Sequence, residues 1–150
     1  MRKRTIARVL AVALGAALAL GALAGCQSPA TGATDQQQAN RTYMTKVNQA
    51  VEELNTRLGE FDEAVAQESV VNMRNKANSA FEAIDALAAI DTPDAMKDLQ
   101  TNYVDGCNKL KDALNSYIDL YTEISSATEE APFDFSAYDG RVKEIQDAYN

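Results

Sequence analysis

Few side chains of this 150-residue chain have types that support catalysis. It contains two Cys, Cys26 and Cys107, and neither His nor Trp. The absence of His excludes a Ser-His-Asp triad, a Cys-His pair and every His-containing metal site. Two Cys are too few for a four-Cys zinc site or a disulfide framework. Glycine-rich phosphate loops and metal-binding motifs are also missing, so we expect no enzyme activity, no cofactor and no bound metal.

Cys107 is expected to fill the hydrophobic core rather than to react. It lies between Tyr103 and Leu110 on the apolar stripe of a predicted helix. Apolar surroundings raise the pKa of a thiol and make it a poor nucleophile. An exposed Cys107 would instead leave open a redox role or a disulfide-linked dimer.

Acidic residues dominate the charge, with 22 Asp and Glu against 14 Lys and Arg and a net charge of −8. Asp98, Asp105, Asp112 and Asp119 recur every seven residues on one predicted helix. Seven residues rise about 10.5 Å along a helix, whereas Ca²⁺ needs oxygens about 2.4 Å from one ion. We therefore expect these aspartates to form the solvated outer line of the helix. A negative surface also repels nucleic acid, so no nucleic-acid partner is expected.

Aromatic residues provide the candidates for a partner-binding face. These candidates are Tyr103, Tyr117, Tyr121, Phe133 and Phe135. The three tyrosines share one face of a predicted helix, and aromatic side chains are enriched at binding surfaces. Tyrosines in such a stripe often pack in the core with the hydroxyl at its rim, so both interpretations stay open. The partner we expect is a protein or envelope ligand whose identity the sequence leaves unknown.

The first 26 residues have the pattern of an export signal. Basic residues open the chain, and an uncharged run from Val9 to Gly25 follows, as in secretory signal peptides. The run ends in Leu23, Ala24, Gly25 and Cys26, which resemble the lipobox of bacterial lipoproteins. This resemblance implies cleavage after Gly25, a diacylglyceryl group on the Cys26 thiol and, often, acylation of the new terminal amine.

The same resemblance implies a protein that is lipid-anchored to a membrane through Cys26, on the extracytoplasmic side of the cell membrane or outer membrane. Gln27 after Cys26, in place of Asp, would permit sorting to an outer membrane. An uncleaved transmembrane anchor is the alternative, since Val9 through Cys26 gives an uncharged run near the lower limit for a span. Loss of residues 1–25 would leave 10 basic and 22 acidic residues, a net charge of −12. Residues 26–34 are small, polar and broken by Pro and Gly, so we expect a flexible tether after the lipidated Cys.

Residues 35–150 are predicted to form an acidic all-α domain, an antiparallel bundle of three long helices plus a short C-terminal helix. Apolar residues recur at helical spacing over residues 43–65, 70–90 and 96–124. No stretch shows the alternation of a strand. Whether residues 65–70 break the first long helix stays open.

Capping residues set the expected helix starts. They are Asp35 in a capping box with Gln38, Ser69, Thr92 ahead of Pro93, and Ser136 or Asp139 for the short last helix.

The combination of a lipobox, a tether and an acidic bundle loosely resembles small helical-bundle lipoproteins of unassigned function. We therefore expect a membrane-anchored cell-envelope lipoprotein that acts as a non-catalytic binding or interaction module. The alternative is a structural or charge-conditioning envelope protein with weak cation binding.

Overall fold

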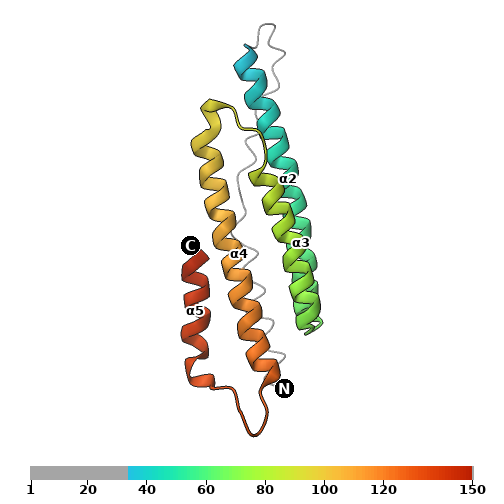
Figure 1. Ribbon diagram of the computed structural model, residues 1–150, viewed down its shortest axis with the longest axis vertical. Helices are drawn as coiled ribbons and strands as arrows, with labels where there is room; N and C mark the ends of the chain where they lie inside the picture. Colours follow the sequence, from blue (N-terminus) through green and yellow to red (C-terminus); the bar gives the residue numbers. More distant parts are fainter. Residues whose placement is uncertain (1–33, 150) are drawn as a thin grey trace.

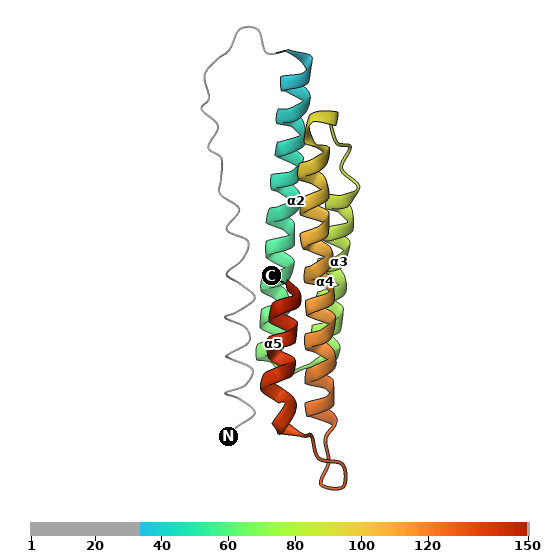
Figure 2. The ribbon, with the colours of Figure 1, turned by 90° about the vertical axis from the view of Figure 1, so that its left-hand side faces the viewer.

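A computed structural model describes residues 34–149, which form a bundle of three long helices and one short C-terminal helix and contain no strand (Figure 1). The helices are α2 (Asp35–Ala66), α3 (Val70–Ala88), α4 (Lys97–Ser126) and α5 (Tyr138–Tyr149). Successive helices run in opposite directions, and α5 lies alongside the second half of α4 (Figures 1 and 2). The predicted all-α antiparallel bundle is thus confirmed.

The predicted signal segment, the lipobox residues Leu23, Ala24 and Gly25, and Cys26 lie outside the described residues. Within residues 34–149, no helix has both the length and the apolar character that a membrane span needs.

The first helix starts one residue earlier than predicted, with Thr34 rather than Asp35 as its N-cap. The Thr34 hydroxyl accepts a hydrogen bond from the Gln37 amide, and the Gln37 side chain accepts one from the Thr34 amide. Both arrangements place a capping residue three positions before a Gln, so their sequence signals are equivalent. Ser69 caps α3 as predicted, since its hydroxyl accepts a hydrogen bond from the Asn72 amide.

The chain breaks between α2 and α3, which decides the question that the sequence left open at residues 65–70. Glu68 has a φ of 55°, a left-handed conformation that usually belongs to Gly after a helix. The Glu68 amide donates to the Val65 carbonyl, and the Ser69 amide donates to the Ala64 carbonyl. These two bonds form a Schellman motif. The usual glycine signal is absent, which is why the sequence left this break as an open question.

Two further predicted caps are wrong. The Thr92 hydroxyl donates to the Ile90 carbonyl at 2.9 Å, and α4 is entered instead through a 3₁₀ turn at Asp94–Met96. Before α5, the Asp134 carboxylate accepts the Ser136 amide and starts a 3₁₀ turn at Phe135–Ala137. Short polar side chains bond readily to nearby backbone outside helices, so several candidates compete at each boundary.

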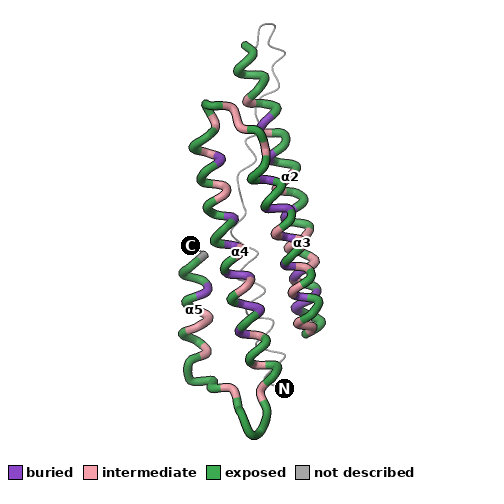
Figure 3. Tube along the Cα trace, viewed as in Figure 1, coloured by how far each residue is buried: buried purple, intermediate pink, exposed green. Residues whose placement is uncertain are grey.

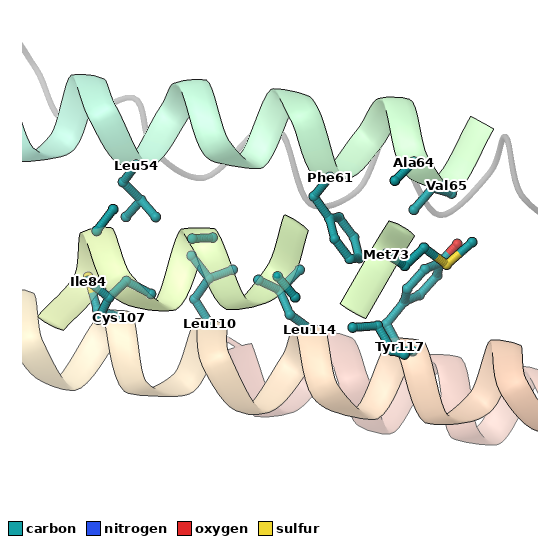
Figure 4. Close-up of a cluster of buried hydrophobic side chains, with 14 residues drawn as sticks. Leu54, Phe61, Ala64, Val65, Met73, Ile84, Cys107, Leu110, Leu114 and Tyr117 are labelled. Carbon is teal, nitrogen blue, oxygen red and sulfur yellow. The ribbon is translucent and has the colours of Figure 1, made fainter. Parts of the chain in front are cut away.

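The core lies between the predicted stripes of α2, α3 and α4. Buried residues recur along each of the three long helices (Figure 3). Leu54, Phe61, Met73, Ile84 and Leu114 are among the almost completely buried members of the core (Figure 4). A second, smaller core joins α4 to α5 through Ala113, Leu120 and Ile145. The apolar surface of α4 is therefore covered on two sides.

A buried polar network connects the three long helices near the start of α4. The Tyr43 hydroxyl of α2 donates to the Gln100 side-chain oxygen at 2.6 Å. The Gln100 side-chain nitrogen donates to the carbonyl of Leu87, in the last turn of α3, at 2.8 Å. Gln100 is only 9% exposed, so it satisfies a tyrosine hydroxyl and a helix-end carbonyl that water does not reach freely.

Replacing Gln100→Ala is expected to lower the free energy of unfolding by about 2 kcal/mol, because it leaves the Tyr43 hydroxyl and the Leu87 carbonyl buried without partners. Urea denaturation followed by circular dichroism measures this loss. Asn102→Ala, at an exposed position two residues later, is the control and should change the free energy by less than about 0.5 kcal/mol. Equal losses in the two variants would contradict the role of the network.

Candidate functional site

The structure separates the five aromatic residues that the sequence proposed as a partner-binding face. Tyr117 is 3% exposed and belongs to the core, whereas Tyr103 and Tyr121 are half-buried along α4. Phe133 and Phe135 lie in the connection after α4, where Phe135 is 55% exposed. These residues do not form one continuous face, and only Phe135 among them is exposed.

Tyr117 packs as a core residue at the side of α4 that meets α2 (Figure 4). Its ring meets the Phe61 ring edge-on at 6.0 Å and lies 6.4 Å from the Tyr121 ring. Burial raises the pKa of the Tyr117 phenol, with smaller contributions from Tyr121, Tyr138 and Asp62. Its hydroxyl oxygen is buried and finds no hydrogen-bond partner among the described residues.

Asp62, on α2, is a carboxylate whose negative charge also raises the pKa of the buried Tyr117 phenol. Burial raises the pKa of Asp62, since a partly buried carboxyl favours its neutral form. No Lys or Arg of residues 34–149 forms an ion pair with it. Asp62 therefore contributes a desolvation cost at neutral pH.

The exposed aromatic surface lies at the end of the bundle opposite the start of α2 (Figures 1 and 2). We define the aromatic tip as residues 127–137, the connection between α4 and the start of α5. Phe133 packs on the small core beside Ile124 and Tyr138. The Phe135 ring meets the Phe133 ring edge-on with centroids 4.9 Å apart. Phe133 thus packs the tip against the bundle, and Phe135 contacts the Phe133 ring while remaining exposed to solvent.

Hydrogen bonds within the tip hold its backbone. The Thr128 amide donates to the Ala131 carbonyl, and the Ala131 amide donates to the Thr128 hydroxyl, both at 3.1 Å. The Ser136 amide donates to the Asp134 carboxylate at 2.8 Å. Hydrogen bonding from the Ser136 side chain, and to a smaller extent from its amide, lowers the pKa of Asp134. These hydrogen bonds define the backbone conformation of the tip on both sides of Phe133.

Acidic residues flank the exposed ring in the sequence. Residues 127–140 include Glu129, Glu130, Asp134 and Asp139 and contain no Lys or Arg. None of these four acids forms an ion pair within the described part of the chain. The neighbouring Glu123, in contrast, is paired with Arg141 of α5, with an Nη2–Oε1 distance of 2.9 Å. The tip therefore combines an apolar ring with uncompensated carboxylates.

Cys107 is 9% exposed and lies in the main core, as predicted. Burial raises the pKa of its thiol, and the nearby Lys111 lowers it by a smaller amount. These surroundings keep the thiol protonated and shielded at neutral pH.

The four regularly spaced aspartates of α4 are all exposed, as expected for a solvated line. Asp119 differs from the other three because it accepts a hydrogen bond from Arg74 of α3 at 2.8 Å. Across residues 34–149, no group of acidic or Cys side chains has the arrangement of a metal site.

Comparison of the chain with protein-family models, with curated proteins and with solved structures finds no match.

Tyr117→Phe is expected to keep or raise the free energy of unfolding, by up to about 1 kcal/mol, because it removes a buried hydroxyl that has no partner in the bundle. Tyr43→Phe is the matched control, and its loss of the bond to Gln100 should lower the free energy by about 1 kcal/mol. Urea denaturation of both variants tests the pair. A large loss in Tyr117→Phe would show that this hydroxyl makes a stabilising bond.

Asp62→Asn should raise stability at pH 7 and lose that advantage in acid. The pKa of Asp62 is higher in the folded chain than in the unfolded chain, so the folded state binds the proton more tightly. Stability therefore falls as pH rises through the folded pKa, and the neutral amide escapes this loss. Denaturation midpoints at pH 7 and near pH 3 measure the difference. An advantage of equal size at both pH values would contradict the stated cause.

Proposed function

We propose that this chain is a cell-envelope lipoprotein, anchored to a membrane through Cys26, that acts as a non-catalytic binding module. The lipobox resemblance of residues 23–26 supports the anchor, because two or three acyl chains hold a protein on a bilayer where one does not. A lipid on Cys26 attaches the bundle without requiring any of its helices to span the bilayer.

The direction of the bundle supports a binding role. Thr34, which caps α2, follows Cys26 by eight residues, and a flexible tether of that length reaches about 15 Å. The start of α2 is therefore the membrane-proximal end in this proposal. The 32 residues of α2 span about 48 Å at 1.5 Å per residue, and the aromatic tip lies at the far end (Figure 2).

The exposed Phe135 ring is the single observation that carries the binding role. Phe135 and Val71 are the exposed large hydrophobic side chains of the described bundle. A scattered apolar residue on a surface needs no explanation. Phe135 differs because its ring contacts a second aromatic ring edge-on, it directly follows the Asp134 cap, and it lies at the end of the molecule (Figure 2). That arrangement supports contact with a partner.

The structural or charge-conditioning role remains the second candidate, and the aspartate line of α4 favours it. Asp98, Asp105 and Asp112 are exposed and have no ion-pair partner among residues 34–149. Exposed carboxylates of this kind attract cations weakly and without a defined site.

The anchor is tested by replacing Cys26→Ser in cells that export the protein. We expect the variant to lose labelling by a clickable fatty acid and to leave a soluble or uncleaved form, because the acylated sulfur is gone. Cys107→Ala is the matched control and should keep full labelling. Undiminished labelling of Cys26→Ser would refute the lipid anchor.

The binding role is tested by photo-crosslinking in intact cells. A photoreactive amino acid is placed at position 135 in the tip or at position 98, an exposed site near the start of α4. A binding module predicts a discrete adduct from position 135 and none from position 98. Adducts from neither position, or the same diffuse adducts from both, would favour the structural or charge role.

A further inference from the structure

We infer that the aromatic tip binds a cationic segment of another protein, with an apolar side chain of that segment against Phe135 and its Lys or Arg side chains beside the tip carboxylates. This inference rests on the proposed binding role and is independent of the lipid anchor. It specifies the chemistry of the partner from the two features that the tip combines.

The apolar half of this recognition is the edge-on pair of Phe133 and Phe135. Phe133 is half-buried on the small core of α4 and α5, so it cannot turn away without opening that core. Phe135 contacts it edge-on, with ring centroids 4.9 Å apart, and leaves its outer face in solvent. Aromatic rings held in this way act as anchors in protein interfaces, because they bury a large area with few rotatable bonds.

The order of the tip favours binding because little conformational freedom remains to be lost. The turn at Thr128 and Ala131 and the Asp134 cap are formed in the free chain. A loop that is already in its bound conformation avoids the ordering cost that flexible loops incur on association. The Phe135 ring therefore already has its exposed position before a partner binds.

The negative charge near the tip favours a positively charged partner. Glu129, Glu130 and Asp139 have no positive neighbour that forms an ion pair within residues 34–149, and no Lys or Arg occurs from residue 127 to residue 140. Complementary charges around an apolar contact speed encounter and exclude the wrong partners. Lys or Arg side chains next to an apolar residue match this surface.

The same charge argues against the two other occupants of an exposed aromatic tip. Anionic lipid headgroups would meet the uncompensated carboxylates of Glu129 and Glu130 and be repelled. A second copy of the chain would bring the same acids to the contact, and residues 34–149 carry 10 basic against 22 acidic residues. A cationic protein segment with an apolar side chain is the partner that matches both the exposed Phe135 ring and the carboxylates.

The test measures binding of fluorescein-labelled peptides to the full chain in an uncharged detergent, with detergent alone subtracted, so that it works with or without a lipid on Cys26. The first peptide places one Leu between Lys residues in a Gly/Ser background. The second has Ala in place of Leu, and the third has Glu in place of Lys. Fluorescence anisotropy at low and high salt gives the affinities.

We expect the Lys/Leu peptide to bind best and to weaken with salt, since exposed charges are screened. Phe135→Ala should weaken it about tenfold, as removal of an interface anchor does. Glu129→Gln combined with Glu130→Gln should also weaken it and reduce the salt dependence. Unchanged circular dichroism verifies that each variant folds.

Two control variants make the same kinds of substitution at exposed positions away from the tip. Val71→Ala removes the other exposed large hydrophobic side chain, and Asp98→Asn with Asp105→Asn removes two charges from the outer line of α4. Both should leave the affinity within about twofold, because surface changes away from a contact have small effects.

Three results would overturn the inference. They are equal binding by the tip variants and the controls, binding of the Glu peptide as tight as that of the Lys peptide, and preferential attachment of the tip to vesicles containing phosphatidylglycerol. A discrete crosslink from position 135 in cells, together with any of these results, would preserve the binding role and reject only the cationic partner.

Discussion

The two-sided burial of α4 is the constraint on which the rest of the structure depends. One side of this helix closes the core against α2 and α3 through residues such as Leu110 and Leu114, and another packs on α5 through Ala113 and Leu120. Apolar burial is the main favourable term in folding, so α5 must return along α4 to cover the second side. That return requires a turn at the end of α4, and the turn is where the aromatic tip forms. The same requirement that completes the small core therefore also presents Phe135.

The helices and the main core could be predicted from the sequence because the spacing of apolar residues reports a helix face directly. Tyr43, Val47 and Leu54 are buried as their spacing indicates. Helix ends were less predictable, because neighbouring polar residues such as Thr34 and Asp35 offer the chain equivalent caps. Glu68 adopts a conformation that its residue type does not favour, so its residue type gave no sign of the break there.

The candidate site was harder to predict than the fold. The stripe of α4 indicated Tyr103, Tyr117 and Tyr121 as one face, but it gave no measure of how deeply a neighbouring helix covers each ring. Gln100 was missed because a glutamine at a core position carries no periodic signal, and its partners Tyr43 and Leu87 lie far away in sequence. Phe133 and Phe135 were predicted as binding residues from their residue type, whereas their edge-on contact in the tip was not predicted.

In the proposed arrangement, the bundle holds its aromatic tip away from the membrane. The most direct measurement is energy transfer from a single dye to acceptor lipids in vesicles that carry the lipidated chain. The dye is attached to Cys in Gln36→Cys or in Ser136→Cys, each on a Cys107→Ala background. We expect strong transfer from position 36, in the first turn of α2, and much weaker transfer from position 136 in the tip. Equal transfer, or stronger transfer from position 136, would show that the tip is not held away from the membrane.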